Sequence, residues 1–203
     1  VDEYGILGTL LNMFLVLASP LDALRNAMAH FSARAEQAGR PAEVRALFRA
    51  WMSRMLMVGL PAGLALVIAA PWVAGFFHFD SPHAVWMAGA LLPIMLIVPV
   101  VAGVLQGLQA FVWMTVSTQS WVVIRLLVGA LLLWMFSATA LTAFFSHALA
   151  QGLGLAIALT GLGLLLRGVA RDGVAPTGVG HYFLQSMLLL AGYGVLMNSD
   201  VML

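Results

Sequence analysis

Five polar side chains that are able to bind an ion or an anionic ligand lie within or beside long apolar stretches of the sequence. They are Asp22, Arg25, Arg125, Asn198 and Asp200. Asp22 and Arg25 are three residues apart, so on a helix they share one face and are able to form an ion pair. Even the lowest scales put a charge at the centre of a membrane helix at about 2.5 to 3.5 kcal/mol against insertion. We therefore treat these five residues as the candidate site.

Two interpretations stay open for each of the two arginines. Asp22 and Arg25 form either an interfacial ion pair, with Arg25 reaching the lipid headgroups, or part of a cavity. Arg125 lies within the stretch V-V-I-R-L-L-V-G-A. If its helix begins at Trp113, Arg125 is about 18 Å deep and does not reach the surface, whereas a start at Trp121 leaves it one turn deep. We favour the deep, cavity-facing position.

No catalytic or metal-binding set accompanies these candidates. The 5 histidines lack the spacing of metal ligands, and we interpret them as interfacial or packing residues. The sequence has no cysteine, which excludes disulfides and thiol nucleophiles. The glycine-rich stretch at residues 167–180 lacks the strand context and the lysine of a phosphate-binding loop. We expect neither an enzyme nor a cofactor.

The composition indicates which elements must position these residues. Hydrophobic residues make up 63% of the 203 residues and charged residues 8%, with a mean hydropathy of +1.02. A soluble domain is about half apolar and a quarter charged. The apolar runs have the length of helices, not the segments of about ten residues typical of a barrel. We predict an all-α fold, a polytopic transmembrane helix bundle, and with a net charge of +1 no nucleic-acid partner.

Six membrane crossings account for the chain, the last of them incomplete. Pro93 and Pro99 predict a bent or locally broken third crossing. In the fifth crossing, small residues that recur every four positions predict a close helix contact; they are Ala148, Gly152, Ala156 and Thr160. The six expected crossings are residues 4–24, a second that starts within 49–54 and ends near 77, 84–105, a fourth within 111–136, 141–166 and 182–203.

Shorter signals mark the ends of these elements. Gly39 followed by Pro41 predicts that one helix stops and the next begins. The sequence G-V-L-Q-G at residues 103–107 is a helix-packing motif, and we interpret Gln106 and Gln109 beside it as boundary residues, weaker candidates for the site.

The basic residues predict the orientation. Six of the nine lie in residues 25–54, and two more, Arg167 and Arg171, lie in the fifth loop. The loops at 78–83 and 137–140 have none. Since Lys and Arg stay on the cytoplasmic side, residues 25–54 and 167–180 are expected there, in a cytoplasmic (inner or plasma) membrane, with Val1 outside. We interpret Arg34, Arg40, Arg45 and Arg49 as topological anchors with no role in recognition.

Four motifs, taken in order, resemble one known family. They are E-Y-G-I-L-G-T at residues 3–9, the arginine-rich inner loop, V-L-Q-G-L-Q-A-F at 104–111, and N-S-D-V-M-L at 198–203. Together they resemble the oligosaccharide and polysaccharide flippases of the multidrug/oligosaccharidyl-lipid/polysaccharide (MOP) exporter superfamily. The likeness covers nearly the whole chain.

The resemblance implies two six-helix lobes around a central cavity that opens alternately to the two sides. Residues 1–168 would form the N-terminal lobe without its first helix, 169–180 a cytoplasmic linker between the lobes, and 181–203 the truncated first helix of the C-terminal lobe. We accordingly expect an internal fragment of a longer protein, which is monomeric.

The resemblance also implies that the protein flips or exports a polyprenyl-linked oligosaccharide or polysaccharide precursor across the lipid bilayer. Arg25 and Arg125 would bind pyrophosphate or acidic sugars, because a guanidinium offers a planar fork to phosphate. Asp22 would orient Arg25, and Asn198 and Asp200, which match the family's N-x-D, would line the cavity or the gate. The alternatives are a multidrug exporter coupled to Na⁺ or H⁺ through Asp22 and Asp200, a lipid II-type flippase, or a membrane scaffold that transports nothing.

Overall fold

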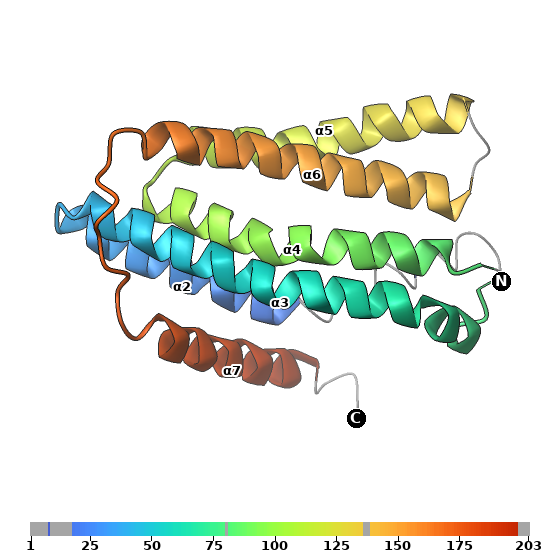
Figure 1. The fold of residues 1–203 in the computed structure, drawn as a ribbon, viewed down its shortest axis with the longest axis horizontal. Coiled ribbons are helices and arrows are strands. Elements are labelled where there is room, and N and C mark those ends of the chain that lie inside the picture. The colour runs from blue at the N-terminus through green and yellow to red at the C-terminus, as the bar shows by residue number, and fades with distance from the viewer. Residues whose placement is uncertain (1–7, 9–17, 80, 136–138, 199–203) are drawn as a thin grey trace.

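The computed structural model describes residue 8 and residues 18–79, 81–135 and 139–198. Every regular element in this part of the chain is an α-helix, which confirms the predicted fold class, and consecutive helices run in opposite directions along the bundle (Figure 1). The helices are α2 (Ala18–Gln37), α3 (Pro41–Phe76), α4 (His83–Gly107), α5 (Phe111–Met135), α6 (Ala140–Leu165) and α7 (Val179–Asn198).

Helix α4 lies at the centre of the bundle. It packs extensively against α2 and α3 on one side and against α6 on the other, with a smaller contact to α5. Helices α5 and α6 form a pair, and α7 packs on α2 (Figure 1). The largest core cluster accordingly joins α2, α3, α4 and α6, and it includes the fully buried Met28, Leu47, Val104 and Leu162.

Four of the described helices, α3, α4, α5 and α6, are long and apolar enough to cross a membrane. On α3, large apolar side chains three or four residues apart point outward, as expected for a surface in contact with lipid; they are Met57, Leu60, Leu64, Ile68 and Trp72. The chain is a membrane-embedded helix bundle. Of the first expected crossing, residues 4–24, only residues 8 and 18–24 are described, and the apolar part of α7 described here, Val179–Leu190, is shorter than a crossing.

The predicted stop and restart between the first two elements is confirmed. Gly39 adopts a left-handed φ of 66° just after α2 ends, and Pro41 occupies the first turn of α3, where its missing N–H costs nothing. The expected start of the second crossing, within residues 49–54, lies about two turns inside α3. Hydropathy marks where a helix enters the apolar layer, and α3 is already helical before that point.

The third crossing was expected to be bent or locally broken, and the local break is absent, because α4 is helical without interruption and contains both Pro93 and Pro99. Pro93 faces two positions of α3 that carry no side chain. A Cβ on Gly59 would lie 3.0 Å from Cα of Pro93, and a Cβ on Gly63 would lie 3.3 Å from its Cδ. The neighbouring helix therefore leaves room for the proline ring at the position where it replaces a backbone hydrogen bond.

The packing motif G-V-L-Q-G brings α4 against α2. A Cβ added to Gly107 would lie 2.5 Å from the carbonyl oxygen of Ala29 and 2.6 Å from Cβ of Ser32. A Cβ on Gly103 would meet the carbonyl oxygen of Arg25 and lie 2.7 Å from Cβ of Met28. All four contacts are too short for any side chain, so the two glycines allow this close approach of the two helices.

The predicted contact stripe on α6 was wrong by part of a turn. Ala156 and Thr160 are exposed, and a side chain on Gly152 would meet nothing within 4 Å. The residues that face α5 and the core are instead Ala150, Gly154, Ala158 and Gly161. A strict repeat of four drifts about 40° around a helix at each step, whereas steps of four, four and three stay on one face.

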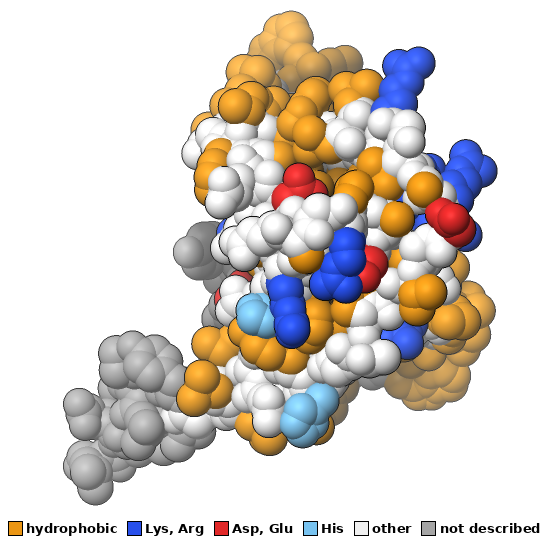
Figure 2. Space-filling model, turned by 90° about the vertical axis from the view of Figure 1, so that its left-hand side faces the viewer, with side chains coloured by type: hydrophobic (Ala, Val, Ile, Leu, Met, Phe, Trp, Pro, Cys, Tyr) orange, Lys and Arg blue, Asp and Glu red, His pale blue; other side chains and the backbone are white. Residues whose placement is uncertain are grey.

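The arginine-bearing loops share one end of the bundle. The turn between α2 and α3 and the loop between α6 and α7 both lie at the left of Figure 1, and Figure 2 looks onto this end, where several arginine side chains gather. The described residues that connect helices at the opposite end, 77–79, 81–82 and 139, include no arginine. The arginine-bearing segments are therefore grouped at one end, and the side of the membrane that this end faces stays a prediction.

The close contact between α2 and α4 predicts an asymmetric response to a single methyl group. Gly107→Ala should lower the free energy of unfolding by about 1 to 3 kcal/mol, because the added Cβ forces the helices apart. Gly152→Ala, in open space on α6, should be neutral or gain up to about 1 kcal/mol. Titration of the purified protein with a denaturing detergent measures both values. Equal stability of the two variants would contradict the packing described here.

Candidate functional site

Arg25 is held by the neutral side chain of Gln106. Its Nε donates a hydrogen bond to Oε1 of Gln106 at 3.0 Å, across the contact between α2 and α4. Both residues are half-buried, while Asp22 is exposed. Among the described residues the one ion pair joins Arg40 and Glu43, so the expected pair of Asp22 with Arg25 is not formed. The glycine contact draws Arg25 towards α4 and away from the exposed Asp22.

Gln106, which was expected from the sequence to be a boundary residue and only a weaker candidate for the site, contacts Arg25 directly. It lies next to the end of α4, as a boundary residue does, yet its side chain provides the partner of Arg25. The available signal was its position between Gly103 and Gly107, which the packing motif already placed against another helix. Gln109 is exposed and adopts a left-handed φ of 55° in the turn that follows α4.

Arg125 lies deep within α5. The helix begins at Phe111, 14 residues before it, and ends at Met135, 10 residues after it, so Arg125 is roughly 21 Å from one end and 15 Å from the other. This supports the deeper of the two positions considered from the sequence. The guanidinium carbon lies 5.9 Å from the ring centroid of Trp121, a cation–π contact, and the side chain is half-buried.

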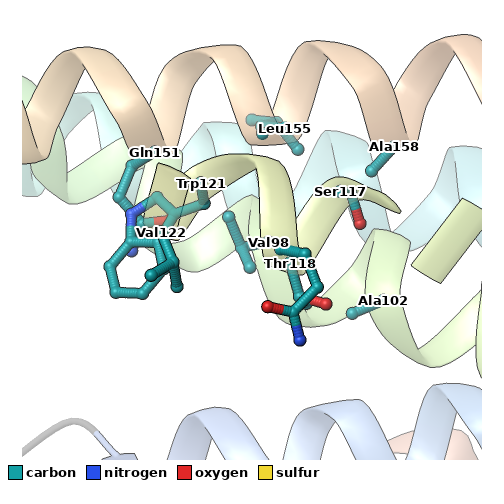
Figure 3. Close-up of a pocket in the computed structure, with 11 residues that line it drawn as sticks. Val98, Ala102, Ser117, Thr118, Trp121, Val122, Gln151, Leu155 and Ala158 are labelled. Atoms are coloured by element: carbon teal, nitrogen blue, oxygen red, sulfur yellow. The ribbon is translucent and has the colours of Figure 1, made fainter. Parts of the chain in front are cut away.

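A cavity of about 350 Å³ lies between α4, α5 and α6. In Figure 3, Ser117, Thr118 and Trp121 extend from α5, and Gln151 comes from α6. Further apolar walls come from the following residues: Val98, Ala102, Val122, Leu155 and Ala158. Arg125 does not line this cavity, so it reaches the cavity only through its contact with the Trp121 ring.

The hydroxyls on the cavity wall already have acceptors within their own helix. Ser117 and Thr118 both donate to the carbonyl oxygen of Met114 at 2.9 Å, which leaves only their lone pairs for a ligand. Nε1 of Trp121 is different, because it is a buried donor without a partner in the part of the chain that the structure describes.

His147 packs between two aromatic rings. Its ring centroid lies 5.6 Å from that of Trp121, edge to face, and 6.1 Å from that of Phe144. Arg125, Trp121 and His147 thus form one cluster between α5 and α6. Within the described residues, Nδ1 of His147 is buried without a hydrogen bond, and no three His, Asp or Glu side chains are placed to hold a metal ion. His147 is packed against the rings of Trp121 and Phe144.

The remaining two candidates fall at the end of the chain. Asn198 is the last residue of α7, and its side chain and the whole of Asp200 lie outside the described residues. Both stay predictions. Arg25 and Arg125 are on helices that do not pack closely against each other, with α4 between them. The structure therefore contains two separate arginine positions.

No protein-family model, curated protein or solved structure matches this chain. The resemblance to the MOP flippases remains a prediction from the motifs.

The hydrogen bond between Arg25 and Gln106 predicts energetic coupling between the two positions. Arg25→Ala and Gln106→Ala should each reduce stability, and the double variant should lose less than the sum. The coupling energy should be about 1.5 to 3 kcal/mol, as for a hydrogen bond that involves a charged group. Asp22→Ala combined with Arg25→Ala serves as the control cycle, and its coupling should be close to zero. Stronger coupling to Asp22 than to Gln106 would refute the assignment.

Proposed function

We propose that this chain forms part of a transporter that flips or exports a lipid-linked oligosaccharide or polysaccharide precursor across the cytoplasmic membrane by alternating access. The observation that carries the proposal is that Arg25 and Arg125 have neutral partners in the described structure: the amide of Gln106 and the indole of Trp121. Neither partner carries a charge. No carboxylate among the described residues neutralises either guanidinium group, so both are able to bind an anionic substrate.

An anionic substrate is favoured because leaving a cation within the membrane without a counter-ion costs free energy. A carboxylate partner would offset much of this cost, as buried ion pairs do. Polar but neutral partners orient the guanidinium and offset less. A diphosphate that enters the membrane-embedded region supplies the missing negative charge and matches the planar fork of arginine. Binding is then strongest for a substrate that carries phosphate or acidic sugars.

The orientation of the bundle completes the proposal. The arginine-rich end faces the cytoplasm by the positive-inside rule, which places Arg25 near the cytoplasmic side and Arg125 deeper in the membrane. On this arrangement a substrate headgroup meets Arg25 first. The chain is assigned to residues 1–168 as the N-terminal lobe, 169–180 as the linker and 181–203 as the start of the C-terminal lobe, and Asn198 and Asp200 would contribute to the cavity or the gate from that last segment.

A multidrug exporter coupled to Na⁺ or H⁺ is the second candidate. The largely apolar cavity of about 350 Å³ between α4, α5 and α6 favours it, because drug-sized ligands bind in cavities of this size. Against it, the sequence has no Asp or Glu from residue 81 to residue 171, and Asp22 is exposed. A coupling ion would lack a buried carboxylate in α4, α5 and α6. Dye efflux that depends on Na⁺ or on a proton gradient would favour this candidate.

Loss of either unpaired arginine should impair transport. In a host that depends on the full-length protein for its surface polysaccharide, Arg25→Ala and Arg125→Ala should each reduce export roughly 10- to 100-fold, the effect of removing one charged hydrogen-bond partner. The lipid-linked precursor should accumulate. Arg25→Lys and Arg125→Lys should recover part of the activity, because lysine keeps the charge and loses the fork. Surface polysaccharide and precursor are quantified together.

The matched control is Arg34→Ala, which removes an exposed arginine from the same helix as Arg25. It should export normally. Each variant is compared at equal amounts of membrane-inserted protein. Normal export by both alanine variants at that level would refute the proposal.

A further inference from the structure

A second basic site lies at the arginine-rich end, in a cleft between α3 and α6. The cleft has a volume of about 540 Å³. Four arginines line it, and no acidic side chain does so among the described residues; they are Arg45, Arg49, Arg167 and Arg171. Helices α3 and α6 do not pack extensively against each other, so the cleft separates two membrane helices.

Arg45 fixes the geometry of this cleft. Its Nη1 donates to the carbonyl oxygen of Leu166 at 3.4 Å and to that of Val169. These carbonyls follow the end of α6, where free acceptors and the helix dipole favour a cation. The guanidinium of Arg45 is thus used internally, and it holds the turn that carries Arg167 and Arg171 against α3.

The other three arginines have free guanidinium groups. Arg49 follows Arg45 by one helical turn on the same face of α3, and Arg49, Arg167 and Arg171 are all exposed. None of the three forms an ion pair within the described residues, although Asp172 and Glu43 belong to the same end of the bundle. Three arginine side chains that form no ion pair within the described residues therefore line the opening of the cleft.

The inner walls of the cleft are apolar. Phe48 on α3 and Leu159 and Leu162 on α6 form them, with Gly163 beside them. Phe48 lies 7 residues after Pro41, and Leu159 lies 6 residues before Leu165, so the walls extend roughly 10 Å from the helix ends. The cleft is cationic at its mouth and apolar inside. A ligand that fits it has an anionic head and a hydrocarbon chain.

We propose that this cleft binds an acidic phospholipid of the surrounding bilayer, with the phosphate between Arg49, Arg167 and Arg171 and an acyl chain along Phe48 and Leu159. Basic pockets between membrane helices on the cytoplasmic side bind such headgroups. A soluble anion would use the mouth and leave the apolar walls empty. The lipid would hold α3 to α6, two helices that do not pack extensively against each other. This role is separate from substrate transport, and it assigns recognition to Arg49, which the sequence analysis treated as an anchor.

The charges are tested first with a pair of matched double variants. Arg49→Gln with Arg171→Gln should weaken binding of phosphatidylglycerol to the purified full-length protein roughly 30-fold, because each arginine near a membrane surface contributes a factor of about five. Arg34→Gln with Arg40→Gln removes the same charge from the same end outside the cleft, and it should leave binding nearly unchanged. Binding is measured by native mass spectrometry and by titration with a fluorescent phosphatidylglycerol, with phosphatidylcholine as the uncharged control.

The apolar walls are tested with a variant that changes no charge. Gly163→Leu adds a side chain in the cleft where a Cβ meets nothing within 4 Å, so the fold should tolerate it. It should weaken phosphatidylglycerol binding at least tenfold and leave binding of inorganic phosphate unchanged. Gly152→Leu fills equally open space on α6 outside the cleft and should have no effect.

Three results would overturn the proposal. Equal weakening by both pairs of arginine variants would indicate a diffuse basic surface. Equal binding of phosphatidylcholine and phosphatidylglycerol would exclude recognition of the charge. Displacement of the lipid by inorganic phosphate, together with full binding to Gly163→Leu, would assign the site to a soluble anion.

Discussion

The close approach of two backbones, those of α2 and α4, determines much of this structure. Lipid gives helices no hydrophobic reason to associate, so their contact rests on van der Waals packing and on hydrogen bonds between them. Gly103 and Gly107 permit that packing, and the hydrogen bond from Arg25 to Gln106 crosses the same contact. Nearer the start of α4, Gly89 meets Gly63 of α3 in the same manner. Glycines of α4 therefore determine how closely α2 and α3 approach this central helix.

Sequence reasoning succeeded where one property of the chain decides the outcome. Hydropathy identified the membrane helices, Gly39 and Pro41 marked a turn, and G-V-L-Q-G marked a packing face. It failed where two properties compete. The stripe on α6 required the helical angle as well as the small residues. The partner of Arg25 depended on which of two polar residues the fold brings near, because local spacing favoured Asp22 and packing selected Gln106.

The arginines divide into groups with different physical roles. Arg25 and Arg125 have neutral partners within the bundle, and Arg45 binds the carbonyls at the end of α6. Arg40 pairs with Glu43 at the surface, where such a pair contributes little to stability. The one-letter sequence gives all of them the same charge. Their differences come from what the folded chain places beside each guanidinium, which composition and spacing do not encode.

The bond between Arg45 and the end of α6 also has a consequence for the order of assembly. Arg45 and its first acceptor, Leu166, are separated by 121 residues. At a synthesis rate of 5 to 20 residues per second, about 6 to 24 seconds pass before the acceptor exists. During this interval the chain from α3 to α6 is synthesised, while the first turns of α3 lack this contact. This contact at the basic end of the bundle therefore forms only after the whole of α6 has been synthesised.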